Sequence, residues 1–208
     1  MENELIAGGT DEFILPRIML SKIYFIRHGE TAWSLSGQHT GRTEMPLTEL
    51  GEQAARSLGV RLHSIHFTKI FTSPRVRARR TGELTGLAGM EIENDLAEWD
   101  YGDYEGLRSA EIRQQQPGWN IYHDGCPNGE SPAQISKRAD RLILRLKTLT
   151  GEVALFSHGH FGRVLAARWI GLPVESAAHF GLNTASLNIL GFEPGLSPVP
   201  AILLWNAT

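Results

Sequence analysis

Residues 24–33 read YFIRHGETAW, and the character of the sequence changes in the middle of this stretch. The apolar run that ends at Ile26 is typical of a buried β-strand, and Arg27, His28 and Gly29 follow it directly. This strand end has two interpretations: a solvated turn, or an imidazole held beside a guanidinium that attracts an anionic ligand. The glycine favours the second, because it lets the backbone turn sharply and approach a ligand closely.

Strands and helices alternate along the rest of the chain. Apolar runs predict strands at residues 22–27, 69–72, 90–93, 152–156, 186–191 and 200–205. Between them we expect helices at residues 48–63, 74–87, 131–149 and 161–170. This alternation predicts an α/β fold, a three-layer αβα sandwich with a mostly parallel central sheet.

Two of the expected helices begin at recognisable caps. Ser131 precedes Pro132, which suits an N-cap followed by the first helical position. Thr48 is expected to cap an earlier helix, in which four apolar residues recur at helical spacing: Leu50, Ala54, Leu58 and Leu62. Residues 97–130 are mixed, and there we expect an insertion with one short helix near residues 109–116.

Composition limits the class of protein. The chain has 208 residues, 41% hydrophobic and 21% charged, which fits one domain at residues 21–208 behind an N-terminal extension at residues 1–20. The net charge of −3 gives no reason to expect a nucleic-acid partner. No apolar run approaches the ~20 residues that span a membrane. The single cysteine, Cys126, excludes an internal disulfide and suits the cytoplasm, where we expect the protein.

The ends of four expected strands carry polar residues. Ligands of such folds bind beyond the carboxyl ends of the strands. The fragments found there are RHGE, SPRVR, LAEWD and SHGH. They bring histidines, arginines and acids to one edge of the sheet, which favours a functional site over surface decoration.

Single fragments leave alternatives open. Arg75 and Arg79 fit a solvated helix face, although one arginine in a first helical turn would clamp a phosphate. Glu98 has three competitors for the role of an acid: Asp100, Asp103 and Glu105.

The late histidines are also ambiguous when taken alone. Either His158 or His160 fits a capped helix start or a core position. A His-x-His zinc site would need further ligands, and the sequence has no HExxH motif or Cys/His cluster. We therefore expect no metal.

Taken in order, RHGET, SPRVRARRT, LAEWDYGDYEGL and SHGH resemble the histidine phosphatase superfamily, also called the phosphoglycerate mutase-like family. The resemblance covers residues 22–205. Three finer stretches, WSLSGQHTGRTEMPLT, EWDYGDYEGL and WNIYHDGCPNGES, resemble the branch with fungal sedoheptulose-1,7-bisphosphatase and mycobacterial acid phosphatases. The resemblance implies a phosphoglycerate mutase-like fold with residues 97–130 inserted over the active site.

The resemblance also implies residue roles. It makes His28 the phosphorylated nucleophile and Glu98 the proton donor, while Arg27, Arg77 and His158 complete the phosphate pocket. It places further residues on the pocket wall: Gln38, Thr40, Tyr101 and Glu130. No cofactor is expected, because cationic side chains replace a metal in neutralising the phosphate.

Two departures from the mutases favour a phosphatase. Mutases have asparagine where this chain has Ser34, a candidate for substrate binding, and an arginine in ERHYG that holds the second acidic group of the substrate. Here Glu98 is followed by Trp99 and Asp100, without a cation. We therefore expect a metal-independent phosphatase for phosphate monoesters, with sugar phosphates or bisphosphates as substrates. Arg163, about one helical turn after the late histidine, is the candidate cation for a second phosphate.

Three other functions stay open. A phosphoglycerate mutase would use the same scaffold, and a non-catalytic regulator that binds phospho-ligands would be expected if the histidine or the acid were lost. A nucleic-acid-binding module would need a wider basic surface than RVRARR supplies. The expected partner is a small-molecule phosphate ester, with neither nucleic acid nor membrane, and a homodimer is left open.

Overall fold

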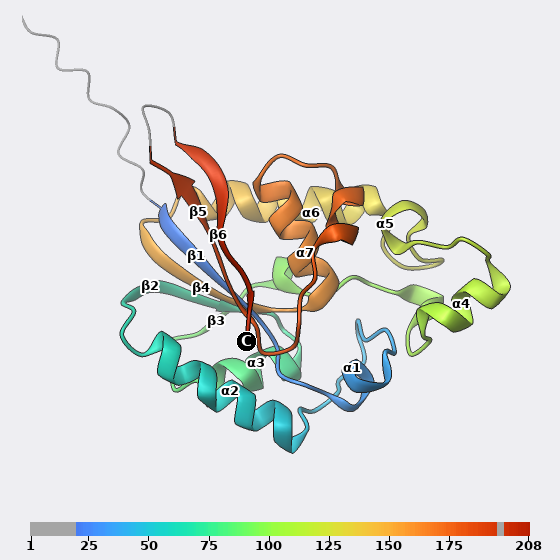
Figure 1. Cartoon of the computed structure of the whole chain (residues 1–208), viewed down its shortest axis with the longest axis horizontal. Coiled ribbons are helices and arrows are strands. Elements are labelled where there is room, and N and C mark those ends of the chain that lie inside the picture. The colour runs from blue at the N-terminus through green and yellow to red at the C-terminus, as the bar shows by residue number, and fades with distance from the viewer. Residues whose placement is uncertain (1–19, 195–197) are drawn as a thin grey trace, which may run out of the picture.

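One mixed sheet organises the protein in the computed structural model, which describes residues 20–194 and 198–208 (Figure 1). The expected N-terminal extension lies almost entirely outside these residues. The sheet has six strands in the order β3-β2-β4-β1-β5-β6. Their bounds are β1 Leu20–Arg27, β2 Phe67–Thr72, β3 Glu91–Ile92, β4 Gly151–Ser157, β5 Leu187–Glu193 and β6 Val199–Ala207.

The prediction of a mostly parallel sheet is confirmed. Strand β1 runs parallel to β4, β4 to β2, and β2 to β3, while β5 and β6 add antiparallel pairs at one side. Strand β1 is therefore flanked on both sides, which explains its unbroken apolar run.

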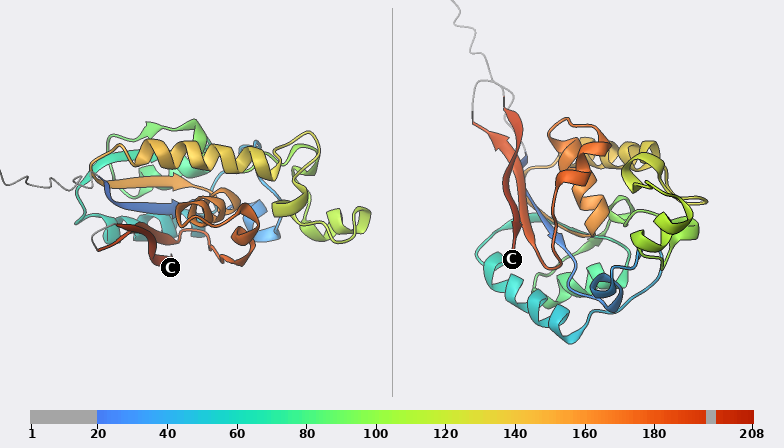
Figure 2. Two further views of the ribbon diagram at one scale, coloured as in Figure 1. Left: turned by 90° about the horizontal axis from the view of Figure 1, so that it is seen from above. Right: turned by 45° about the vertical axis from the view of Figure 1, so that its right-hand side comes forward.

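Helices cover both faces of the sheet, as the predicted three-layer sandwich requires (Figures 1 and 2). Helices α2 (Glu49–Leu62) and α3 (Val76–Leu84) lie on one side, and α6 (Pro132–Leu146) and α7 (Gly159–Trp169) on the other. Alternate residues of β1 divide between two cores. Phe25 packs with residues of α6 and α7, whereas Ile26 packs with residues of α2. A period of two is what a pleated strand imposes.

Both predicted caps are present. The side chain of Thr48 accepts a hydrogen bond from Gly51 N, and Ser131 forms a capping box ahead of Pro132. The buried face of α2 was predicted wrongly at its start: Leu50 is 66% exposed, and Ala55 is buried with Leu58. Leu58 and Leu62, later in the helix, are buried as their spacing predicted.

Helix α3 is shorter at both ends than predicted. It begins at Val76 because Arg75 is extended, with φ −76° and ψ 136°. It ends at Leu84, since Gly86 adopts φ +77°, a conformation that favours glycine and does not continue a helix.

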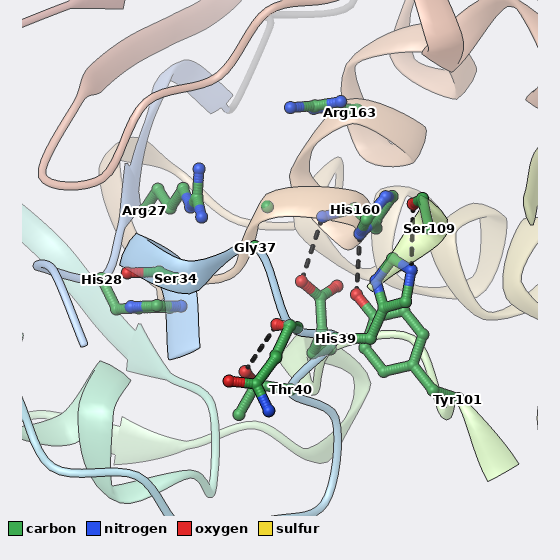
Figure 3. Close-up of a pocket in the computed structure, with 13 residues that line it drawn as sticks. Arg27, His28, Ser34, Gly37, His39, Thr40, Tyr101, Ser109, His160 and Arg163 are labelled. Atoms are coloured by element: carbon green, nitrogen blue, oxygen red, sulfur yellow. Dashed lines mark hydrogen bonds between the residues drawn. The ribbon is translucent and has the colours of Figure 1, made fainter. Parts of the chain in front are cut away.

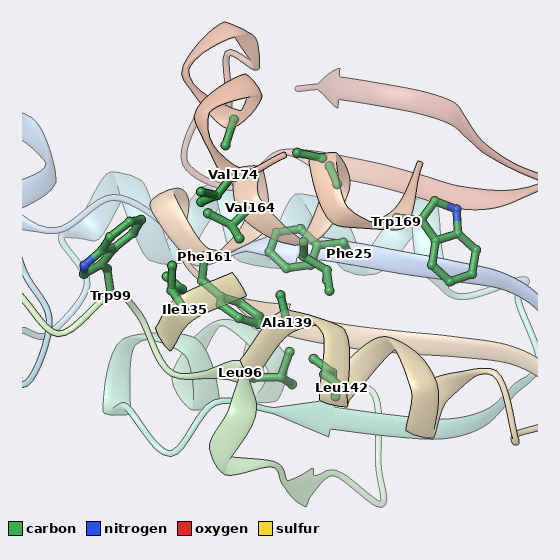
Figure 4. Packing of buried hydrophobic residues seen from close by; sticks show 14 of the residues in the cluster. Phe25, Leu96, Trp99, Ile135, Ala139, Leu142, Phe161, Val164, Trp169 and Val174 are labelled. Atoms are coloured by element: carbon green, nitrogen blue, oxygen red, sulfur yellow. The ribbon is translucent and has the colours of Figure 1, made fainter. Parts of the chain in front are cut away.

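Residues 97–130 contribute to the main core rather than forming a separate layer. Trp99 and Trp119 are buried in the same cluster as residues of α6 and α7 (Figure 4). The expected short helix is α4 (Ser109–Gln115). The other short elements are α1 Ala32–Ser36, η1 Asn94–Leu96, η2 Gly102–Tyr104, α5 Ile121–Asp124 and η3 Val174–His179.

Within the described ranges, no helix has the length and apolar character needed to cross a membrane.

Candidate active site

Two histidines meet where β1 and β4 end. Arg27 and Ser157 are register partners on these parallel strands, so His28 and His158 emerge side by side. Their ring centroids are 5.2 Å apart. The amide of His28 also donates to Ser157 O at 2.9 Å, which continues the strand pairing by one residue.

A backbone carbonyl fixes the tautomer of His28. Its Nδ1 lies 2.7 Å from Gly29 O, and a carbonyl only accepts hydrogen bonds, so neutral His28 carries its proton on Nδ1. The lone pair of Nε2 is then free. Burial, followed by the charges of Arg77 and Arg27, lowers the pKa of His28 well below its usual value. The imidazole is therefore held neutral, as attack on phosphorus requires.

Gly29 is needed for a different reason from the one that the sequence suggested. A Cβ at this position would lie 2.5 Å from Gly51 O, at the start of α2. The amide of Gly29 donates to Thr81 Oγ1 at 2.9 Å. The glycine thus lets the turn after β1 pack against α2 and α3.

Arg77 lies behind this pair of histidines in the first turn of α3. Its side chain is completely buried, and its Nη atoms donate to the carbonyls of Thr40, Gly41 and Thr43. Its Nε has no hydrogen-bond partner among the described residues. Its neighbours behave as the alternative interpretation expected: Arg75 is paired with Glu44 and Arg79 is exposed.

Five further buried side-chain atoms are also without partners in the described part of the chain: Arg27 Nε, Arg75 Nε, Arg163 Nε, His158 Nδ1 and the Tyr122 hydroxyl. Two of them, Arg27 Nε and His158 Nδ1, belong to residues near His28. Arg27 Nη1 donates to Leu182 O at 2.5 Å, and His158 Nε2 lies 2.7 Å from Ser73 Oγ. Each side chain is thus held by one nitrogen and leaves another unsatisfied beside His28. Burial lowers the pKa of His158 well below its usual value.

Glu98 is fixed by the start of α7. Its carboxylate accepts hydrogen bonds from His160 N at 3.0 Å, Phe161 N at 2.8 Å and Trp99 N at 2.9 Å. Burial of the Trp99 ring in the core anchors the backbone beside it.

The three competing acids are engaged elsewhere. Asp100 forms an ion pair with Arg42, Asp103 accepts from Asn128, and Glu105 accepts the amides of Gly41 and Thr43.

A cavity of about 220 Å³ joins these groups (Figure 3). Arg27, His28 and Glu98 line it, whereas Arg77 and His158 lie behind its wall. The cavity is also lined by five of the predicted substrate-binding residues: Ser34, Gln38, Thr40, Tyr101 and Arg163.

Glu130 does not line this cavity, contrary to the pocket-wall role that the resemblance implied. Its carboxylate forms an ion pair with Arg138, with distances of 2.8 Å and 2.7 Å, and accepts from Asp100 N at 3.1 Å. Its carbonyl accepts from the indole of Trp99 at 2.9 Å. Glu130 therefore supports the segment next to Glu98.

Sequence reasoning missed five residues of the cavity wall: Gly37, Gly159 and three with polar side chains, His39, Ser109 and His160. His39 stands between the two predicted positions Gln38 and Thr40, which was the available signal. His160 was noted only as an alternative helix start. No group of three His, Cys, Asp or Glu residues suited to a metal occurs at the positions that the structure describes.

Comparisons with known proteins agree with this geometry. Residues 23–208 match the model of the histidine phosphatase superfamily (branch 1). An acid phosphatase of Mycobacterium tuberculosis is 44% identical over 179 residues, which cover 84% of this chain and 88% of that protein. A sedoheptulose 1,7-bisphosphatase of Saccharomyces cerevisiae is 38% identical over 183 residues, covering 72% and 68%.

The fold agrees as well. A solved structure of a protein from Mycobacterium tuberculosis superimposes with a TM-score of 0.86 at 41% identity and covers 90% of this chain and 98% of its own. The prediction of a phosphoglycerate mutase-like fold is thus confirmed. The chain belongs to the histidine phosphatase superfamily, branch 1, and is a phosphatase of that family.

Proposed function

We propose that this phosphatase hydrolyses sugar phosphates or sugar bisphosphates through a phosphohistidine on His28, without a metal. The observation that carries the proposal is that three of the six buried side-chain atoms without partners in the described residues belong to residues near His28: Arg27 Nε, Arg77 Nε and His158 Nδ1. An unsatisfied buried polar group is costly. All three residues lie near the imidazole of His28, and a phosphoryl group bound there would offer oxygens to their unpaired nitrogens.

The first chemical step transfers the phosphoryl group. His28 Nε2 attacks phosphorus in line while the ester P–O bond breaks. Arg27 and Arg77 neutralise the equatorial oxygens, and His158 supplies a further hydrogen bond. Glu98 gives its proton to the departing alkoxide.

The second step uses water. Glu98, now a carboxylate, takes a proton from a water molecule that attacks phosphorus. The P–N bond breaks, phosphate leaves, and both His28 and Glu98 return to their starting protonation. Trp99 N and the two α7 amides keep the carboxylate at one place in both steps.

The chemistry of the outer cavity supports a hydroxylated, anionic substrate. Its wall offers hydroxyl, amide and imidazole groups, and Glu98 is the one carboxylate that lines it within the described residues. Arg163 adds a cation on the same cavity, from the α7 turn that follows the late histidine. This arrangement suits a second phosphate better than it suits an apolar or a cationic leaving group.

The test is a substrate panel measured in EDTA. We expect turnover of p-nitrophenyl phosphate in the chelator, and kcat/KM for sedoheptulose 1,7-bisphosphate or fructose 1,6-bisphosphate well above that for 3-phosphoglycerate. Loss of turnover in EDTA would contradict the metal-independent mechanism. Equal values of kcat/KM for bisphosphates and simple monophosphates would instead indicate an acid phosphatase with broad specificity.

A further inference from the structure

Three rings, those of His39, Tyr101 and His160, pack together on the cavity wall, and we call them the ring cluster (Figure 3). The rings of His39 and Tyr101 are stacked, with centroids 4.6 Å apart and an interplanar angle of 23°. The ring of His160 lies 5.6 Å from His39 and 5.7 Å from Tyr101. None of these rings has a part in the chemical steps derived above.

One hydrogen bond inside the ring cluster fixes a proton. Tyr101 OH lies 2.7 Å from His160 Nδ1, and no other partner of this hydroxyl occurs among the described residues. Tyr101 is only 2% exposed, so a phenol proton that pointed elsewhere would be buried without an acceptor. Burial raises the pKa of Tyr101, which keeps the phenol protonated. Tyr101 therefore donates, and His160 Nδ1 accepts.

The direction of this bond determines the tautomer of His160. When Nδ1 accepts, the proton of neutral imidazole must be on Nε2. Burial, followed by the charges of His39, Arg163 and Arg27, lowers the pKa of His160 well below its usual value. His160 Nε2 has no partner in the described part of the chain and is not among the fully buried unpaired atoms. The side chain lines the cavity, so this N–H is open to a ligand.

We propose that His160 is a specificity-determining residue whose Nε2–H donates to an oxygen of the leaving group, in a tautomer that Tyr101 fixes. The inference rests on the proposed function, since it assigns a contact to the substrate of the same site. The place of His160 suits the role: its backbone amide donates to Glu98 Oε2 at 3.0 Å, so its ring stands next to the proton donor. A neutral donor selects hydroxyl or carbonyl oxygens without adding charge beside Arg163.

The kinetic test compares two substrates with equally poor leaving groups. One is glucose 6-phosphate, and the other is n-hexyl phosphate, which lacks the sugar oxygens. The variant is His160→Phe combined with Tyr101→Phe, because removal of both partners leaves no buried hydroxyl unpaired. We expect the ratio of kcat/KM for the sugar over the alkyl ester to fall about 3- to 10-fold, as loss of one neutral hydrogen bond predicts.

Two controls accompany this measurement. His66→Phe replaces an exposed histidine away from the cavity, and its ratio should equal that of the parent protein. His160→Gln keeps a side-chain N–H donor and should recover part of the ratio. An unchanged ratio in the double variant would overturn the assignment.

A second test does not depend on turnover. Long-range ¹⁵N NMR of the His28→Ala protein reports the tautomer of each histidine, and the His160→Phe spectrum identifies the signals. We expect His160 in the Nε2–H form, and a mixture of tautomers after Tyr101→Phe. Glucose 6-phosphate should shift the Nε2–H signal of His160, whereas n-hexyl phosphate should not. An Nδ1–H tautomer, or equal shifts with both esters, would overturn the inference. Absence of hydrolysis with the expected NMR result would instead contradict only the proposed function.

Discussion

The two ends of the cavity are built differently. At the phosphate end, His28, Arg77 and His158 follow strands or open a helix against them, and their exposed fractions are 5%, 0% and 0%. At the leaving-group end, the wall comes from residues 34–40, residues 101–109 and the outer side of α7. Buried strands and helices hold a few catalytic atoms rigidly. The sequence of connecting segments can change with little effect on the packing of the core. In the proposed function, the strand ends position the chemistry, whereas the connecting segments and the start of α7 select the substrate.

The largest effect is expected at the phosphate end. In the proposed mechanism His28 forms the covalent bond to phosphorus, so His28→Ala should lower kcat by roughly 10⁴-fold or more for every ester. Labelled phosphate should also be absent from the protein. The measurement is rapid quench with radiolabelled substrate, in which the label on the parent protein survives base but not acid, as phosphohistidine does.

His158 offers a matched control for that experiment. It is a buried histidine at the neighbouring strand end, and its Nε2 is engaged with Ser73 Oγ at 2.7 Å. His158→Asn should slow turnover and still allow the label to accumulate. Labelled phosphate on the His28→Ala protein would mean that another residue is the nucleophile. The contrast between the two ends of the cavity would then not hold.

Glu98 stands between the two ends, and its replacement should depend on the leaving group. We expect Glu98→Gln to lower kcat/KM for sugar phosphates by roughly 10²- to 10⁴-fold, because a poor leaving group needs a proton. The value of kcat/KM for p-nitrophenyl phosphate should fall much less, because its leaving group, p-nitrophenolate, is stable without a proton. Steady-state rates on both substrates decide the point.

Asp100 provides the control for Glu98. It is two residues away and is paired with Arg42. Asp100→Asn should therefore change kcat/KM for both substrates to the same modest extent. If Glu98→Gln lowered kcat/KM equally for both substrates, Glu98 would only support the fold. If instead the loss of kcat/KM in Asp100→Asn depended on the leaving group, Asp100 would be the proton donor.

Much of the phosphate end could be predicted from the sequence. A continuous apolar run that ends in RHGE, and a second that ends in SHGH, place two histidines at one sheet edge by topology alone. Composition could not select Glu98 over Asp100, because both are acids on the same segment. The structure separates them through contacts from α7, more than sixty residues later in the chain.

The leaving-group end was predicted less well. Glu130 was placed on the cavity wall by resemblance, but its ion pair with Arg138 turns it into a support for Trp99 and Asp100. His39 was missed because a histidine in a loop has no periodic signal. Packing of three rings from distant segments creates that wall, and no local pattern encodes such packing.

Arg163 tests the leaving-group end directly. The Arg163→Ala protein should show about a 10-fold higher KM for a sugar bisphosphate, as loss of a contact to a charged group predicts. The effect on p-nitrophenyl phosphate, which has no second phosphate, should be clearly smaller. Arg168→Ala is the matched control, because this arginine of the same helix is paired with Asp140 and lies outside the cavity. A KM increase of equal size on both substrates would assign Arg163 to the phosphate end.

The smallest effect concerns stability against acid, and it too distinguishes the two ends. Burial lowers the pKa of His39 to about 4, and it lowers those of His28 and His158 well below 6.5. A lowered pKa means that the folded state resists protonation, so the stability is complete above pH 6.5 and is lost as the pH falls below it. For His39 the loss between pH 7.5 and 5 amounts to about 2 kcal/mol in the free energy of unfolding.

Phosphate should offset only part of this loss. A bound anion favours protonated histidines at the phosphate end, whereas His39 lies at the other end and remains costly to protonate. Urea unfolding of His39→Gln at pH 7.5 and 5 should show a smaller acid loss than the parent, with or without saturating inorganic phosphate. In the parent, phosphate should reduce the loss without abolishing it. Complete recovery by phosphate alone would mean that the two ends titrate as one site, because His39 would then sense the anion as strongly as His28 and His158 do.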